Sequence, residues 1–479
     1  MPDNRDDKSG FPLLGRRGLA AVDFASPKQA LADPVVTEPL RRLCERARAG
    51  LREKLTTATV ICAIVVLAAG LVVWLWGYPR QKDNPGFWHF GLVSMLFWLS
   101  ITQGMSAVSC ILRVAHASWR YPINRMLDMA SLFGLWVWAL LPFLVVARNR
   151  IYVLGASEYR DNVWRLAGPT FYDALAIGTA YVAGWMLLYL TSIPDFALLR
   201  DRVDCDMRLR ALYARLSTGW HGSHSQWTTL RFAEGILVIG GLVAFTASQT
   251  VLGWDFQLAS ARDWDSSIFA PLYTLGSLLG GLAMSTLVMT AVKRVLGDRS
   301  PIRVDHYDNI GKFMIGLGLL WFYFRWCDFL TAWYEHVPAE WQIQNNRITA
   351  FPYLAGLMVL GCFVVPVFAN MFAPIRKSTA GQCVISLFVL TGIAVQRFLD
   401  TVPTFAPNYP VTALTPSFAS IVAFAGLTAM FVLTYLIGAR FVPIASVWGA
   451  VKSRTRSSTW AIGGEHVDVI AVDPPVWET

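Results

Sequence analysis

The segment from Phe87 to Arg148 reads FWHFGLVSMLFWLSITQGMSAVSCILRVAHASWRYPINRMLDMASLFGLWVWALLPFLVVAR, two apolar stretches separated by a short basic bend. As helices, Phe87–Leu112 and Ile123–Ala147 are each long enough to cross a hydrocarbon layer of roughly 30 Å, which takes about 20 residues. The bend between them carries arginines and aromatic residues, which favour the headgroup region of a bilayer. The segment therefore predicts a hairpin of two membrane-spanning helices.

One carboxylate lies at the start of the second apolar stretch. Asp128 follows Arg125 by three residues, at a depth where an acid is costly unless it is paired, hydrated or protonated. Such an acid is by default a candidate functional residue. The alternative is an ion pair with Arg125 that only fixes the end of the helix, and the sequence leaves both interpretations open.

The composition extends this prediction to the whole chain. Apolar residues make up 55% of the 479 residues and charged residues 15%, and the mean hydropathy is +0.44. This balance excludes an ordinary soluble protein and predicts an all-α polytopic membrane protein. The net charge of +9 fits loops that lysine and arginine hold on the cytoplasmic side, so we expect a lipid bilayer and no nucleic acid as the surroundings.

We predict ten transmembrane helices. They cover residues 57–76, 87–112, 123–147, 171–193, 232–252, 268–292, 310–335, 351–373, 383–401 and 413–438. If the N-terminus is cytoplasmic, most of the 41 lysines and arginines lie on that side, except those of the loop 148–170.

This topology defines the domain organisation. A cytoplasmic N-terminal segment with an amphipathic helix (1–56) precedes the transmembrane domain (57–438), and a cytoplasmic tail (439–479) follows it. The predicted location is the bacterial inner membrane, with both termini in the cytoplasm.

The cysteines and histidines bear on cofactors. None of the seven cysteines forms a C-x-x-C pair, the spacing that zinc sites and iron–sulfur clusters favour. The histidines lie near predicted helix ends or outside the spans, whereas a membrane haem needs two facing imidazoles. We expect no haem, iron–sulfur cluster or metal ion held by this chain.

Several ionisable residues fall within the predicted spans. Arg325 and Asp328 are three residues apart and so share a helix face, and Asp173 lies about one turn inside the fourth span. Others of this kind are Glu234, Lys312, Arg397 and Asp400. One such residue alone is more often structural, but a set spread over separate helices is typical of a proton route or a polar ligand cavity.

Five short motifs follow one another along the predicted helices. They are Phe97-Trp-Leu-Ser-Ile-Thr-Gln-Gly, Trp119-Arg-Tyr-Pro-Ile-Asn-Arg-Met-Leu-Asp128, Ser192-Ile-Pro-Asp-Phe-Ala-Leu-Leu-Arg-Asp-Arg202, Gly219-Trp-His-Gly222 and Trp254-Asp-Phe256. In order and spacing they resemble motifs of the NrfD/polysulfide-reductase membrane-subunit family, closest to the quinol-oxidising membrane subunit of alternative complex III. The resemblance covers about residues 70–440.

The resemblance carries expectations about fold and partners. It implies two four-helix bundles plus two further helices, with a quinone pocket near the outer face and no cofactor held by the chain itself. Electrons would pass to an iron–sulfur subunit on the periplasmic side. The complex can also contain a molybdopterin-like subunit and multihaem c-type cytochromes.

The resemblance also marks individual positions. Those that match polar family positions are Asp128, Asp173, Asp328 and Arg397. Where the family has histidines, this chain has Gln103, Val145, Gln249 and Asp265. Glutamine can form a hydrogen bond with a quinone carbonyl, but unlike histidine it cannot take the proton of a quinol.

The first functional hypothesis is an integral membrane subunit of an electron-transfer complex that contributes to a quinone or quinol site, for menaquinone or ubiquinone, and to proton translocation. We expect proton transfer at Asp173, Asp328 and Asp128. Quinone contacts are expected from Arg148, Gln249, Asp255, Gln103 and Arg325. Two alternatives stay open: a structural membrane anchor of a periplasmic redox complex without quinone chemistry of its own, and a secondary transporter.

Overall fold

The computed structural model describes residues 61–72, 85–138, 169–201, 207–258, 264, 266–297, 300–405, 418–444, 446, 455–462 and 465–472. Within them, eight helices are long and apolar enough to cross a membrane. This confirms the prediction of a helical polytopic membrane protein. The predicted number of ten stays a prediction, because the spans expected at 57–76 and 123–147 lie partly outside the described residues.

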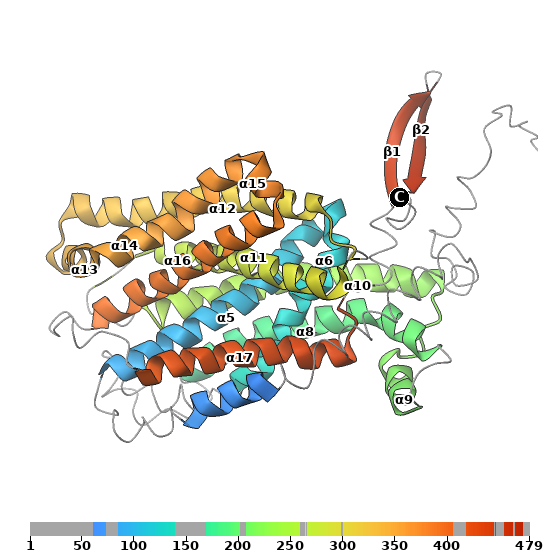
Figure 1. Cartoon of the computed structure of the whole chain (residues 1–479), viewed down its shortest axis with the longest axis horizontal. Coiled ribbons are helices and arrows are strands. Elements are labelled where there is room, and N and C mark those ends of the chain that lie inside the picture. Colours follow the sequence, from blue (N-terminus) through green and yellow to red (C-terminus); the bar gives the residue numbers. More distant parts are fainter. Residues whose placement is uncertain are drawn as a thin grey trace, which may run out of the picture.

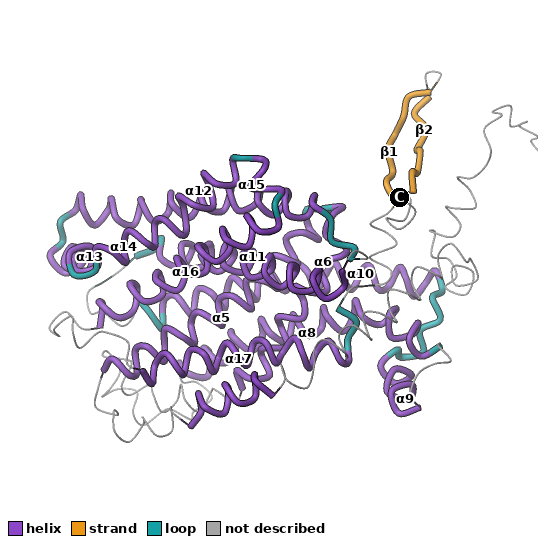
Figure 2. The backbone as a smooth tube through the Cα atoms, viewed as in Figure 1, coloured by secondary structure: helices purple, strands orange, loops and turns teal. Residues whose placement is uncertain are grey.

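The long helices run nearly along one direction (Figures 1 and 2). They are α5 (Pro85–Val114), α8 (Pro169–Arg200), α10 (His224–Trp254), α11 (Phe269–Leu296), α12 (Val304–Glu335), α16 (Thr379–Phe405) and α17 (Phe418–Phe441). The eighth span, Pro352–Ala369, consists of α14 (Pro352–Val359) and the π-helix η6 (Leu360–Ala369). Shorter segments are Ile61–Val72, η1 (Ser118–Arg120), α6 (Tyr121–Asp128), η2 (Met129–Phe133), α9 (Met207–Leu216), α13 (Pro338–Thr349) and α15 (Ala373–Lys377).

Three helices form the centre of the molecule. The apolar window of α5 is 89% buried, whereas that of α8 is only 28% buried. Around α5, the segments α6, η2, α8 and α10 form one group, and α11, α12, η6 and α16 form a second. The contacts of α5 with α11 and α16 join the two groups, so side chains on these three helices can connect one group to the other.

Two glycines explain why α5 and α11 lie so close together. A Cβ atom at Gly104 would lie 2.0 Å from the carbonyl oxygen of Ser277, and one at Gly281 would lie 2.4 Å from the carbonyl carbon of Gly104. Only glycine leaves room for this approach, as is common between membrane helices. The close contact places the polar side chains of both helices within hydrogen-bonding reach.

The outer surface of the bundle is apolar. On α10, Phe232, Ile236, Ile239 and Val243 are 57–70% exposed and repeat at helical spacing. A surface of this kind suits contact with lipid tails, while polar side chains turn inward. The arrangement is therefore that of a bundle immersed in a bilayer.

The C-terminal segment departs from the all-α prediction. Strands β1 (Thr455–Ile462) and β2 (Glu465–Val472) pair antiparallel, with Thr455 opposite Val472 and Ile462 opposite Glu465. The pattern of β-branched residues at Thr455, Thr459, Val467 and Val469 favours strands, a signal that the assignment of 439–479 as a tail overlooked. This hairpin stands away from the helices (Figure 1).

Candidate functional site

A buried ion-pair cluster joins the C-terminal end of α5 to the C-terminal end of α6. Arg113 binds Asp128 through two nitrogens, at 2.6 and 3.0 Å, and its Nε donates to Glu234 at 2.8 Å. Ser109 donates a further hydrogen bond to Asp128 at 2.6 Å. The side chain of Asp128 is 1% exposed and that of Glu234 is 30% exposed, so the cluster joins a buried acid to an acid nearer the surface.

The expected alternative pair of Asp128 with Arg125 is wrong. Arg125 instead binds Asp195 at 2.8 Å and donates to Ser192 at 2.6 Å, joining α6 to α8. Residues three apart share a face, but here Arg125 turns toward α8 while Asp128 turns toward α5. Asp128 therefore forms no ion pair with Arg125 of its own helix and instead links α6 to α5.

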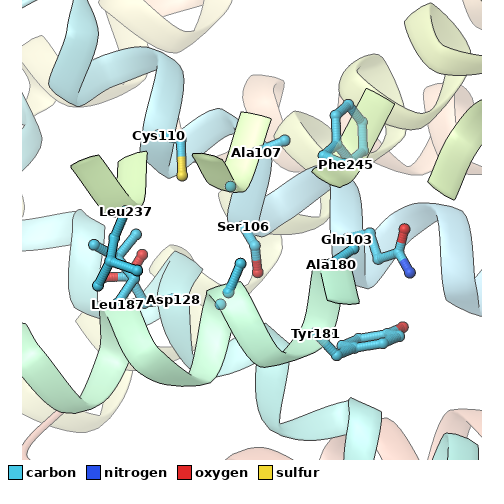
Figure 3. Close-up of a pocket in the computed structure, with 13 residues that line it drawn as sticks. Gln103, Ser106, Ala107, Cys110, Asp128, Ala180, Tyr181, Leu187, Leu237 and Phe245 are labelled. Carbon is cyan, nitrogen blue, oxygen red and sulfur yellow. The ribbon is translucent and has the colours of Figure 1, made fainter. Parts of the chain in front are cut away.

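A small cavity begins beside Asp128. It measures about 20 Å³, enough room for a water molecule. Figure 3 shows Asp128 on one side of it, Gln103 and Tyr181 on the other, and Ser106 between them. The cavity therefore offers a water-sized gap between a carboxylate and the polar side chains deeper in the bundle.

From the cavity, hydrogen bonds lead through the middle of the bundle. Gln249 Nε2 donates to Gln103 Oε1 at 2.7 Å, and Ser277 Oγ donates to Gln249 Oε1 at 2.6 Å. Arg397 Nη2 then donates to Ser277 Oγ at 2.9 Å. All four side chains are at most 3% exposed, and they come from α5, α10, α11 and α16.

A second ion-pair cluster lies toward the other end of the bundle, next to α13. Arg325 binds Asp400 at 2.8 Å and lies 3.6 Å from Asp328, and Arg347 lies 3.8 Å from Asp400. Gln344 donates to Asp328 at 2.9 Å. Asp400 follows Arg397 by three residues, so this cluster continues the buried polar chain on the same face of α16.

Arg347 and Gln344 come from a helix that the sequence analysis placed in a loop. Their helix α13 is polar and has 12 residues, too few to span a bilayer, so hydropathy gave no signal for it. Burial lowers the pKa of Arg347, and the nearby Asp400 opposes this shift. The guanidinium nevertheless stays protonated at physiological pH.

The structure brings together some of the residues expected at the site and separates others. Gln103, Gln249 and Asp128 lie along the cavity and the chain, while Arg325 and Asp328 lie in the second cluster. Asp173 is buried near the start of α8, and Asp255 is the half-buried C-cap of α10. Arg148 lies outside the described residues.

The polar chain contains residues that the sequence analysis did not select. Ser277 and Tyr273 sit in an apolar helix, where serine and tyrosine are common and carry no signal of their own. Arg397 and Asp400 were recognised as buried ionisable residues, but Asp400 was given no role, because its ion pair with Arg325 joins residues 75 positions apart.

The arrangement of the described residues also bears on whether this chain could hold a metal ion. Among them, no three His, Cys, Asp or Glu side chains come together as a metal site would need. These residues do offer hydrogen-bond donors, carboxylates and the water-sized cavity beside Asp128.

No protein-family model matches the chain, and no curated protein matches it.

Proposed function

We propose that this protein is the integral membrane subunit of a quinol-linked electron-transfer complex, and that protons cross it along the buried polar chain. The observation that carries the proposal is the continuity of that chain. It runs from Glu234, Arg113 and Asp128 to the cavity that Gln103 also lines, and hydrogen bonds lead from Gln103 to Arg397, which lies three residues before Asp400 of the cluster at Arg325.

Proton transfer needs groups that can exchange a proton and short gaps between them. Asp128 is the buried acid at one end, and a water in the adjacent cavity bridges it to the side chains beyond. Beyond the cavity, the hydroxyl of Ser277 lies between Gln249 and Arg397; in this proposal hydroxyl groups and water carry the proton, while the amides and the guanidinium only hold the hydrogen-bond network in place. Buried acids in membrane proteins commonly serve such relays.

The quinone belongs in this proposal at the far end of the chain, near Arg325 and Asp328. A volume of about 20 Å³ holds a water but not a quinone ring, so the cavity itself is not the quinone site. Gln249 uses both ends of its amide within the protein. A menaquinone or ubiquinone would therefore meet the cluster from the periplasmic side, where an iron–sulfur subunit would receive its electrons.

Membership of the NrfD/polysulfide-reductase membrane-subunit family is part of the proposal. Its support is that motif residues meet in space. Arg125 of the second motif binds Ser192 and Asp195 of the third, and Arg200 of the third motif donates to the Trp220 carbonyl of the fourth at 3.2 Å. If the protein belongs to this family, its partners would include molybdopterin-like and multihaem cytochrome subunits. Both termini would then lie in the cytoplasm of a bacterium.

A structural membrane anchor is the second candidate function. The small volume of the cavity, about 20 Å³, favours this function, because an anchor needs no space for a quinone. The two candidates differ in one respect that can be measured, which is whether quinone stays with the complex.

The test is to purify the complex in mild detergent and to analyse its subunits and its extractable quinone. We expect iron–sulfur or multihaem proteins to co-purify with quinone, and the quinone content to fall in Asp328→Asn and in Asp173→Asn. Asp308→Asn is the control, since Asp308 pairs with Lys312 and Arg376 away from the polar chain. The same partners without quinone would favour the anchor, and a chain that purifies alone would contradict both.

A further inference from the structure

A short basic segment joins η6 to α16 at one surface of the bundle. The span that η6 completes ends at Ala369, and α16 begins at Thr379. Between them, α15 carries Arg376 and Lys377. Because so few residues separate the two spans, α15 lies at the level where a bilayer has its headgroups.

Two cations from different helices share one carboxylate at this surface. Arg376 Nε donates to Asp308 Oδ1 at 2.6 Å, and Lys312 Nζ lies 2.6 Å from Asp308 Oδ2. Lys377, the residue after Arg376, adds a third cation. Three positive charges therefore gather around the single negative charge of Asp308.

The neighbouring charges do not cancel this excess. Arg303 and Asp305, at the start of α12, offset each other. Lys293 and Arg294, in the last turn of α11, are both cations, and the Lys293 ammonium lies 5.3 Å from the centre of the Tyr307 ring of α12. The described ends of α11, α12 and α15 thus carry an excess of positive charge, which favours an anionic ligand.

The three cations near Asp308 combine a fixed group with two accessible ones. Arg376 Nη1 donates to the Asn370 carbonyl at 2.9 Å, and its stem packs on α12, where a Cβ at Gly311 would lie 2.5 Å from Arg376 Cγ. The side chain of Lys312, in contrast, is 56% exposed, and Lys377 is exposed as well. A ligand at the surface can therefore reach both lysines without any cavity in the bundle.

Exposed apolar side chains border these cations. Phe368, Met371 and Phe372 are 51–63% exposed, and Ile375 of α15 is 39% exposed. Cations beside exposed apolar side chains at headgroup level match the two parts of a phospholipid, a charged phosphate and its acyl chains. A free anion would make no use of the apolar side chains.

We propose that this surface binds one anionic phospholipid, with Arg376, Lys312 and Lys377 around the headgroup and the acyl chains along Met371 and Phe372. A phosphate oxygen accepts charge-assisted hydrogen bonds from guanidinium and ammonium groups, so one headgroup can satisfy all three cations. The proposal rests on charge, exposure and position in the bilayer, and it does not depend on the electron-transfer function proposed above.

Native mass spectrometry of the purified complex tests the site. The probe is phosphatidylglycerol, offered in detergent micelles together with an equal amount of phosphatidylethanolamine that has the same acyl chains. We expect the wild type to retain phosphatidylglycerol in preference. Replacing Lys312 and Lys377 together by Gln should weaken its binding roughly 25-fold, because each lysine near an anionic lipid contributes about fivefold.

Arg231→Gln is the matched control, since it removes one positive charge from an exposed residue near the start of α10. Because α10, α11 and α12 are consecutive spans, α10 and α12 begin on the same side of the membrane. We expect Arg231→Gln to retain phosphatidylglycerol as the wild type does. The double replacement of Lys312 and Lys377 by Arg, which keeps both charges, should retain it too.

Three results would overturn the proposal. The first is a wild type without preference for phosphatidylglycerol, a result that needs no variant to fold. The second is an equal loss of the lipid in Arg231→Gln, which would leave only a general attraction between positive loops and anionic lipid. The third is displacement of the lipid by an excess of inorganic phosphate, which would assign the surface to the free anion.

Discussion

At the scale of single residues, several buried charges of this protein are paired between different helices. Asp128 pairs with Arg113 from the preceding helix rather than with its neighbour Arg125, whose partner Asp195 is 70 positions away. Each pairing fixes a specific contact between two helices, because breaking it would leave an uncompensated charge in a medium of low dielectric.

The Arg125–Asp195 pair gives a direct test of this cost. Replacing Asp195 by Ala should destabilise the protein by roughly 3–5 kcal/mol, because Arg125 would remain buried without its counter-charge. The measurement is thermal unfolding of the purified protein in detergent.

Asp201→Ala is the matched control. Asp201 also pairs with an arginine at 2.8 Å, but its side chain is 54% exposed, so the loss should stay below about 1 kcal/mol. Equal melting temperatures for the two variants would show that the buried pair does not stabilise the fold.

Sequence reasoning identified the acids of the site but not their partners. Asp128, Asp328 and Arg325 stand out because ionisable residues are rare in apolar segments. The partner of each depends on which faces of the helices meet, and helical periodicity cannot supply this for helices that are apolar all round. Arg125 and Asp128 illustrate the difficulty, since they share a face by spacing and yet bind different helices.

At the scale of elements, the polar chain depends on the close packing of α5 against α11. Gly104 and Gly281 let the two backbones meet, and this contact holds Gln103 and Gln249 near Ser277. The glycines thus act on the chain through the distance between helices, without forming any of its hydrogen bonds.

Gly281→Ala should separate these helices. Its new Cβ would lie 2.4 Å from backbone carbon of α5, which cannot move aside as a flexible side chain could, so we expect a loss of roughly 1–3 kcal/mol. Gly316→Ala in α12 is the control, since its Cβ would meet nothing within 4 Å. There alanine should leave stability unchanged or raise it by up to about 1 kcal/mol.

Thermal unfolding in detergent again gives the comparison. If Gly281→Ala were as stable as Gly316→Ala, the contact between α5 and α11 would not require glycine. This would contradict the explanation that close packing of these helices holds Ser277 near Gln249.

The elements themselves were largely predictable. Long apolar runs gave the positions of eight described spans, because hydrophobic length is a direct physical requirement of a bilayer. Three features escaped this criterion. Helix α13 is polar and short, the π-helical form of η6, which contains Pro366, leaves no mark on hydropathy, and the β1–β2 hairpin lies in a segment too polar for hydropathy to resolve.

At the scale of the whole molecule, the two ion-pair clusters lie toward opposite ends of a bundle that a bilayer would surround. The cluster at Arg113 lies near α6 and the cluster at Arg325 near α13, and Figure 1 shows α13 at the left end of the bundle and α6 in its right half. The polar chain proposed as a proton route therefore runs along the length of the bundle.

This orientation can be tested by labelling. Cysteines are placed at His221, before α10, and at His336, after α12, both exposed positions. In spheroplasts, a membrane-impermeant maleimide should label His336→Cys directly and His221→Cys only after permeabilisation, because the lysine-rich and arginine-rich loops lie on the cytoplasmic side. Labelling of both from outside would contradict the topology.

The most direct test of the central claim is the number of protons carried per electron by the complex reconstituted in liposomes. With a quinol as donor, we expect Asp128→Asn to keep electron transfer but lose proton translocation, because the amide cannot take up a proton beside the cavity. Asp308→Asn, a paired acid away from the chain, should translocate protons as the wild type does. Wild-type proton translocation by Asp128→Asn would contradict the proposed route.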